Sequence, residues 1–174
     1  MISKQFLSES IHRKERSFMR MKHALSQLND QELWWRPFPH MNSIGHLILH
    51  LEGNLTQWII DPLNNNSNHR EREKEFSATQ NLSVLEAVEL ANDLSAQVKK
   101  AMQHFSAENL GEGIEVQNRK TTYLSAIYSA ITHLEGHVGQ IMYITRQLKG
   151  DSYQLFDHYG LNEQLGDYQH PSDQ

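Results

Sequence analysis

The sequence contains no cysteine. This absence excludes a disulfide framework, a thiol nucleophile, an iron–sulfur cluster and any zinc site built from thiolates. No apolar run reaches the ~18 residues expected of a membrane-spanning helix. Residues 1–16 have neither an uninterrupted apolar stretch nor a small-residue cleavage site, so we expect no secretory signal.

The sequence also has no excess of positive charge. Sixteen lysines and arginines stand against 21 aspartates and glutamates, which gives a net charge of −5 and a pI of about 6.1. This balance argues against direct binding to duplex DNA. A length of 174 residues suits one domain, with a core large enough to stabilise the fold without disulfide cross-links. We therefore expect a cytoplasmic protein with no nucleic-acid or membrane partner.

Four segments carry apolar residues at the spacing of three and four that marks one face of a helix. They are residues 3–29, 43–61, 83–106 and 121–149. Ser83 and Glu86 have the spacing of a capping box, and Gly150 follows the last segment. The predicted fold is all-α, a four-helix bundle over residues 1–150. Residues 151–174 are predicted to be a C-terminal tail, partly packed or disordered.

The connections between these helices have less regular patterns. Residues 31–41 contain two prolines and are predicted to be extended, with Trp34, Trp35 and Phe38 covering the end of the core. Asp61 and Pro62 are expected to end the second helix. The polar residues 63–80 are predicted to form a surface loop, long enough for a crossover connection. Residues 114–116 alternate in polarity and suggest a short extended piece.

Histidine is abundant, with 11 residues in the chain. His133 and His137 lie four residues apart on the fourth helix, as do His46 and His50 on the second. Residues at this spacing project from one helix face, so each pair can reach a single ion. Both pairs border the buried face of their helix, with Asn54 one turn beyond His50.

Two interpretations of these histidines remain open. One such pair is more often structural than metal-binding, whereas two pairs on core-forming helices make the two interpretations about equal. Glycines near the histidines suggest close helix approach or room for a ligand, since glycine inside a helix costs about 1 kcal/mol relative to alanine. These glycines are Gly45, Gly53, Gly136 and Gly139.

Residues 33–37 and 42–54, with residues 133–141, resemble the DinB/YfiT-like superfamily of small bacterial helical bundles. The resemblance covers about residues 3–150. It implies a bundle with a crossover, a homodimer, and a divalent ion bound by His50, His133 and His137. His46 lies one turn before the ligand position, as a neighbour or a reserve ligand. Val138 stands where the superfamily often has arginine, which leaves any role of that arginine vacant or supplied elsewhere.

Three imidazole ligands leave coordination positions open, as in catalytic metal sites. The resemblance implies two chemistries on a small molecule, a thiol-dependent S-transfer that uses a low-molecular-weight thiol or a hydrolysis. The expected ion is zinc or nickel. Asn54, Gln140 and His46 are candidates for contacts to substrate or to the ligands. Glu52 and Glu135 are expected to be solvated, as are the charges of residues 70–74.

The alternative is a non-catalytic bundle. In that hypothesis the chain is a dimeric interaction or stress-associated protein, and its histidines are structural or bind metal incidentally.

Overall fold

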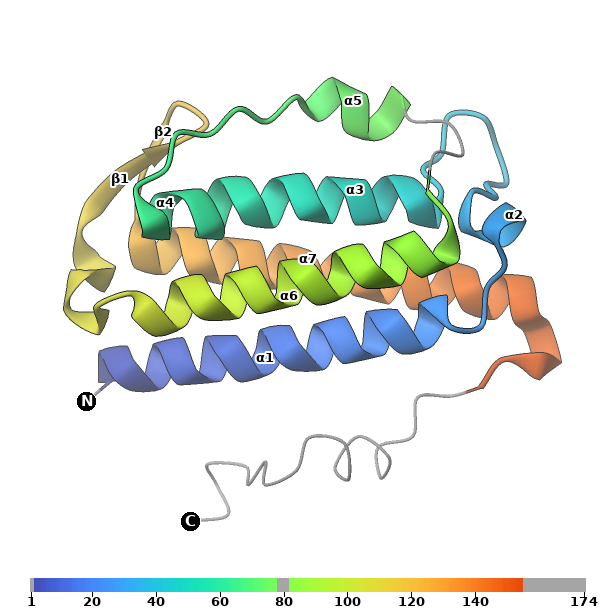
Figure 1. Cartoon of the computed structure of the whole chain (residues 1–174), viewed down its shortest axis with the longest axis horizontal. Helices are drawn as coiled ribbons and strands as arrows, with labels where there is room; N and C mark the ends of the chain where they lie inside the picture. The colour runs from blue at the N-terminus through green and yellow to red at the C-terminus, as the bar shows by residue number, and fades with distance from the viewer. Residues whose placement is uncertain (1, 78–81, 155–174) are drawn as a thin grey trace, which may run out of the picture.

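A computed structural model of the chain describes residues 2–77 and 82–154. Four long helices form a bundle, which confirms the predicted all-α class (Figure 1). They are α1 (Ile2–Leu25), α3 (Ile44–Leu55), α6 (Val84–His104) and α7 (Tyr123–Lys149). Most of the predicted tail, residues 155–174, lies outside the described residues. Within the described part of the chain, no helix is both long and apolar enough to cross a membrane.

The bundle has a crossover, as predicted. Helices α1 and α3 each pack against both α6 and α7, so α1 and α3 occupy diagonal positions. Helices α3 and α6 run in the same direction, because residues 65–77 return along the outside of α3 (Figure 1). We call residues 65–77 the strap. Helices α3 and α7 pack side by side and run antiparallel. They correspond to the second and fourth helices predicted from the sequence.

The core is apolar and draws on all four helices. Its largest fully buried apolar side chains include Phe18 and Met21 of α1, Leu51 of α3, Met102 of α6 and Ile127 of α7. Lys14 is also fully buried. Its Nζ donates hydrogen bonds to the carbonyl oxygen of Ser95 at 2.9 Å and to the hydroxyl of Ser95 at 3.1 Å. The whole of this side chain, rather than its aliphatic stem alone, therefore belongs to the interior.

The second helix does not end at Asp61 and Pro62, so that prediction was wrong. It continues through a π-helical turn, η1 (Thr56–Ile60), into α4 (Asp61–Asn64). Pro62 has no N–H, and in a regular α-helix its ring would meet the carbonyl of Trp58. A wider π turn relieves that clash without ending the helix. Asn65, with a φ of 56°, then ends α4.

The strap is more ordered than a surface loop. It contains α5 (Arg72–Ser77), which packs against α3. The first helix is shorter than predicted, because a separate α2 (Asp30–Leu33) begins at an Asn29–Glu32 capping box. The predicted capping box of Ser83 and Glu86 is present at the start of α6. Two short 3₁₀ turns, η2 (Ala107–Gly111) and η3 (Gly150–Ser152), complete the helical elements.

Two short strands form a hairpin before α7. They are β1 (Gly113–Val116) and β2 (Arg119–Thr122), antiparallel, with Val116 opposite Arg119. Both residues of the connecting turn, Gln117 and Asn118, have positive φ, which suits a tight turn between twisted strands. The extended piece predicted at residues 114–116 thus has a partner strand. Thr122 caps α7, and Gly150 ends it with a φ of 53°.

The segment after α2 only partly covers the core. Trp34 is buried, and its indole Nε1 donates a 2.8 Å hydrogen bond to the carbonyl of Leu82. The prediction was wrong for Trp35 and Phe38, which are 38% and 57% exposed. The extended geometry predicted for residues 31–41 was also wrong, because α2 includes residues 31–33 and the chain turns at residues 37–41, where the N–H of Met41 donates a 3.0 Å hydrogen bond to the carbonyl of Phe38.

Candidate metal centre

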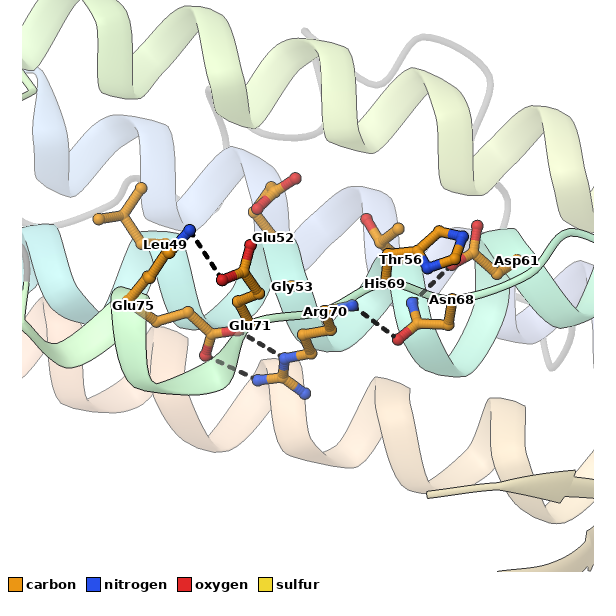
Figure 2. A pocket seen from close by; sticks show the side chains of 11 residues that line it. Leu49, Glu52, Gly53, Thr56, Asp61, Asn68, His69, Arg70, Glu71 and Glu75 are labelled. Carbon is orange, nitrogen blue, oxygen red and sulfur yellow. Dashed lines mark hydrogen bonds and ion pairs between the residues drawn. The ribbon is translucent and has the colours of Figure 1, made fainter. Parts of the chain in front are cut away.

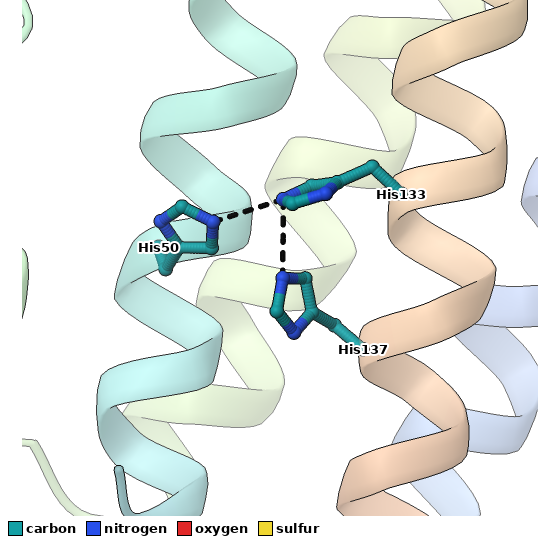
Figure 3. Close-up of side chains that lie close together, drawn as sticks. All are labelled: His50, His133 and His137. Carbon is teal, nitrogen blue, oxygen red and sulfur yellow. Dashed lines mark hydrogen bonds between the residues drawn. The ribbon is translucent and has the colours of Figure 1, made fainter. Parts of the chain in front are cut away.

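Three histidines meet between α3 and α7. The Nε2 atom of His133 lies 2.9 Å from Nε2 of His50 and 3.1 Å from Nε2 of His137 (Figure 3). One nitrogen from each ring lies within 4.8 Å of the other two. His50 is buried, and the other two are partly buried. The structure therefore brings together the three residues that the resemblance implied as ligands.

The helix geometry explains this convergence. His133 and His137 lie one turn apart on α7 and project from the same face. Helix α3 packs against that face, and His50 is directed across the interface toward both rings (Figure 3). The ring centroid of His50 lies 5.1 Å from the ring centroid of His133 and 5.0 Å from that of His137. The i,i+4 pair thus supplies two donors, and the neighbouring helix supplies the third.

Hydrogen bonds favour one tautomer in two of these rings. The Nδ1 atom of His50 lies 2.9 Å from the carboxylate Oε2 of Glu75, which can only accept a hydrogen bond when ionised. The Nδ1 atom of His137 lies 2.7 Å from the amide oxygen of Gln140. Both contacts place the ring proton on Nδ1. The lone pair of each Nε2 atom is therefore directed into the cluster, as a metal ligand requires.

The pKa shifts of His133 and His50 favour neutral rings. Burial lowers the pKa of His133 to about 4, and the neighbouring His137 and His50 add to the shift. Burial also lowers the pKa of His50, although the hydrogen bond to Glu75 opposes the change. Neutral imidazole is the form that binds a metal ion.

The strap carries an ion pair onto the outer side of His50. Arg70 donates to both carboxylate oxygens of Glu75, from Nε at 2.5 Å and from Nη2 at 2.8 Å. The two side chains are only 5% and 9% exposed. Burial alone would raise the pKa of Glu75, but the hydrogen bonds from Arg70 and His50 lower it below the usual value. The carboxylate therefore stays ionised beside His50.

Sequence reasoning missed Arg70 and Glu75, because their charges were interpreted as part of a solvated loop. The signal that locates them is Gly53, on the outer face of α3. A Cβ atom at Gly53 would collide with Oε1 of Glu75 and would lie 2.8 Å from Nε of Arg70. Glycine at this position lets the ion pair lie directly on the helix.

Further polar contacts anchor the strap to η1 and α4, which continue α3. Arg70 Nη1 donates to the Gln57 side-chain oxygen at 3.0 Å, and Asn68 donates to Asp61 at 2.6 Å. Figure 2 shows the strap residues and α3 around a pocket of about 500 Å³. Glu52 also lines this pocket, and burial together with the charge of Glu75 raises its pKa. Glu52 is therefore half-buried on the exposed side of α3.

The other predicted site residues lie around the cluster rather than in it. His46 belongs to the capping box of α3, where its Nδ1 lies 2.7 Å from the hydroxyl of Ser43. Gln140 contacts His137 as described above. The side-chain oxygen of Asn54 is buried and has no hydrogen-bond partner among the described residues. Glu135 forms an exposed ion pair with Arg13 at 3.2 Å.

The glycines near the histidines have different surroundings. A Cβ atom at Gly45 would lie 3.0 Å from the Trp34 ring, so close approach explains this glycine as it explains Gly53. At Gly136 and Gly139 a Cβ atom would meet no described neighbour within 4 Å. Close helix packing therefore does not explain the two glycines of α7.

Val138 is fully buried in the core. A side chain at this position faces the bundle interior, away from solvent. The strap places a different guanidinium group near the cluster, with Arg70 Nη2 at 3.1 Å from Nδ1 of His50.

The donor set fits a divalent ion of the zinc type. Metal–nitrogen bonds of about 2.0–2.1 Å at a tetrahedral angle separate two nitrogens by about 3.3 Å. The Nε2 separations of 2.9 and 3.1 Å are close to that value. Carboxylate and amide groups on the outer nitrogens of two rings complete the pattern found around metal-binding histidines.

Comparison with known proteins agrees with this architecture. A family model described as "Protein of unknown function (DUF1572)" matches residues 1–157. No match was found among curated proteins.

Solved structures share the fold. A conserved protein from Enterococcus faecalis has a TM-score of 0.69 at 20% identity, over 83% of this chain and 97% of that chain. A DinB-like protein from Bacillus cereus has a TM-score of 0.66 at 16% identity, over 88% and 97%. A DinB-like protein from Bacillus subtilis, YjoA, has a TM-score of 0.64 at 14% identity, over 87% and 96%. The predicted resemblance to DinB-like proteins is confirmed as a shared fold.

Proposed function

The chain belongs to the DUF1572 family of proteins of unknown function, and we propose that it is a metal-dependent enzyme acting on a small molecule. In this proposal the Nε2 atoms of His50, His133 and His137 hold a divalent ion, zinc or nickel. One observation carries the proposal: three Nε2 atoms converge, and the Nδ1 contacts of two rings direct their lone pairs into the cluster.

The number of ligands favours catalysis over a structural role. A structural zinc site is closed by four protein ligands, whereas a catalytic site keeps a position for substrate. The described residues offer three histidine donors here and no fourth histidine or carboxylate within the cluster. When bound, the ion supplies a Lewis acid that lowers the pKa of a water or thiol and polarises a carbonyl group.

The chain's own residues orient the ligands. The carboxylate of Glu75 accepts a hydrogen bond from Nδ1–H of His50, and Arg70 holds that carboxylate in place with two hydrogen bonds. The amide oxygen of Gln140 accepts a hydrogen bond from Nδ1–H of His137 in the same way. The unpartnered oxygen of Asn54, one turn after His50, is available to accept a hydrogen bond. These side chains are the proposed positioning residues of the site.

Two nucleophiles suit this site, a water or a thiol. Because the chain contains no cysteine, any sulfur nucleophile must come from a low-molecular-weight co-substrate. Attack by water would make the protein a hydrolase, and attack by the co-substrate would make it an S-transferase. The proposed location is the cytoplasm and the proposed assembly is a homodimer.

A substrate screen with a ligand-deficient control tests the proposal. Zinc- and nickel-loaded protein without a histidine tag is assayed for hydrolysis of small esters and amides, and for addition of glutathione or cysteine to electrophiles. The matched control is the His133→Ala/His137→Ala variant, whose fold is checked by circular dichroism before the assay. Turnover by the wild type that the variant lacks supports the proposal. Wild-type protein that binds metal without any turnover would favour the non-catalytic alternative.

A further inference from the structure

A second cavity opens beside the histidine cluster. It lies between the first half of α3 and the second half of α7, with residues 35–42 along its rim, and has a volume of about 960 Å³. We call it the groove. Its apolar wall includes Trp35, Phe38, Met41, Leu47, Tyr143 and Ile144. This volume is near the upper end of the range of about 300–1,000 Å³ for small-molecule sites.

The groove adjoins the cluster at His137. His137 and Gln140 line it, and these residues are one of the three converging histidines and its hydrogen-bond partner. His137 therefore has one side in the cluster and another in the groove.

The groove wall carries no formal charge. Its remaining polar residues are amides and histidines, and no aspartate, glutamate, lysine or arginine is among the described residues that line it. The pocket beneath the strap has the opposite character, with Glu52, Asp61, Arg70 and Glu71 in its lining. Burying a charged group without a partner is costly. The groove therefore selects against a molecule whose body is ionised.

The aromatic residues of the groove are also unusually exposed for their size. Phe38 is 57% exposed and Tyr143 is 65% exposed. A bound apolar group would remove both rings from water, which favours binding in proportion to the area covered. The groove is accordingly built to gain affinity from an apolar or aromatic body.

From these observations we infer that the substrate is an uncharged, largely apolar small molecule whose reactive end lies at His137. This inference rests on the proposed function, because it assigns the body of the substrate to the groove and the reactive end to the histidine cluster. It places a polar, ionised co-substrate outside the groove.

Three hydroxamic acids with the same metal-binding group test the inference. They are acetohydroxamic acid, octanohydroxamic acid and suberic acid monohydroxamate, whose eight-carbon chain ends in a carboxylate. Each is titrated by calorimetry into the zinc-loaded full chain and into zinc-free protein. Each buried methylene strengthens binding up to about fourfold. We expect octanohydroxamic acid to bind about 100-fold more tightly than acetohydroxamic acid, and at least tenfold more tightly than the carboxylate analogue.

Two exposed tyrosines of α7 provide matched variants. Tyr143→Ser removes a groove residue, whereas Tyr128→Ser removes a 61% exposed ring outside the groove. Tyr143→Ser should weaken octanohydroxamic acid at least fivefold and leave acetohydroxamic acid unchanged. Tyr128→Ser should change neither.

The outcomes separate this inference from the proposed function. If zinc or acetohydroxamic acid fails to bind, the proposed function fails and the inference fails with it. If acetohydroxamic acid binds but all three compounds agree within threefold, the inference alone is overturned. The inference is likewise overturned if Tyr143→Ser leaves octanohydroxamic acid binding unchanged, or if its main effect is to dissociate a dimer in sedimentation experiments.

Discussion

Glu75 is the residue through which the strap acts on the candidate metal centre. Its carboxylate lies 2.9 Å from Nδ1 of His50, and Arg70 holds it there. Loss of such an outer hydrogen bond typically lowers metal affinity 10- to 100-fold. We predict that Glu75→Gln lowers zinc affinity by about this factor, measured by competition with a chromophoric chelator.

Glu71→Gln provides the control for this change. Glu71 lies on the same strap, but its side chain is 65% exposed and forms an ion pair with Lys74. Its replacement should leave zinc affinity unchanged. Equal affinities for wild type and Glu75→Gln would contradict the role assigned to Glu75.

Lys14 should make the stability of the protein depend on pH. Burial lowers its pKa from the ordinary 10.5 to about 8. Between these pH values the Lys14 side chain is neutral in the folded protein and still protonated in the unfolded chain. In linkage terms the unfolded state binds more protons in this window, and raising the pH therefore stabilises the folded state. Below pH 8 both states are protonated and the penalty for the buried charge is constant.

The Lys14→Met variant isolates this effect. We predict that its stability advantage over wild type shrinks by about 1–2 kcal/mol between pH 7 and pH 9.5. Denaturant unfolding at the two pH values measures the change. Lys22→Met serves as a control on the same helix, since Lys22 bonds to Asn92 in an exposed contact. A constant difference between Lys14→Met and wild type would refute the depressed pKa.

At the scale of elements, the packing of the strap on α3 depends on Gly53. A Cβ atom there would displace Glu75 or Arg70. We predict that Gly53→Ala destabilises the protein by about 1–3 kcal/mol, because overpacking outweighs the gain in helix propensity. The same variant should bind zinc more weakly, because the displaced carboxylate no longer orients His50.

Gly136→Ala is the matched substitution on α7. A Cβ atom at position 136 would meet no described neighbour within 4 Å, and the position lies on the exposed side of the helix. Alanine there should stabilise the protein by up to about 1 kcal/mol. Thermal unfolding and zinc titration of both variants distinguish the positions. Equal behaviour of the two variants would mean that the strap does not depend on Gly53.

The helices of the bundle were predictable because their signals are local. Apolar spacing, the Ser83 capping box and Gly150 act within a turn or two of the chain, and they place the long helices correctly. The predicted end of the second helix at Pro62 was wrong, because a π turn before Pro62 lets the helix continue past it. The predicted ligand set of His50, His133 and His137 came from the resemblance, and the structure brings these three side chains together.

The strap could not be predicted from the same signals. Residues 70–75 alternate in charge, a pattern that is typical of solvated segments. Only the packing of the strap against α3 buries Glu75 beside His50. Trp35 and Phe38 show the reverse case: large apolar side chains that sequence reasoning places over the core instead line the groove. Long-range packing decided both outcomes.

At the scale of the whole molecule, a bound ion should stabilise the fold, because its ligands come from two helices of the bundle. Zinc at 100 times its dissociation constant should add about 2.7 kcal/mol to the free energy of unfolding. For a chain of this size we expect the melting temperature to rise by roughly 5–10 °C. The His133→Ala/His137→Ala variant should show no rise. An equal rise in both proteins would indicate binding elsewhere.

The homodimer implied by the resemblance is also a prediction about the whole molecule. Sedimentation equilibrium at several protein concentrations, with and without zinc, measures the mass of the assembly. A mass of twice 20.2 kDa would support the dimer. A single mass of 20.2 kDa at all concentrations would refute it.

Metal content is the most direct test of the central claim, that His50, His133 and His137 form a metal centre. Elemental mass spectrometry is applied to protein without a histidine tag, after incubation with divalent ions and desalting, beside the folded His133→Ala/His137→Ala variant. The account predicts close to one zinc or nickel ion per chain in the wild type and a marked loss in the variant. Wild-type protein that retains no ion, or a variant that retains as much as the wild type, would contradict it.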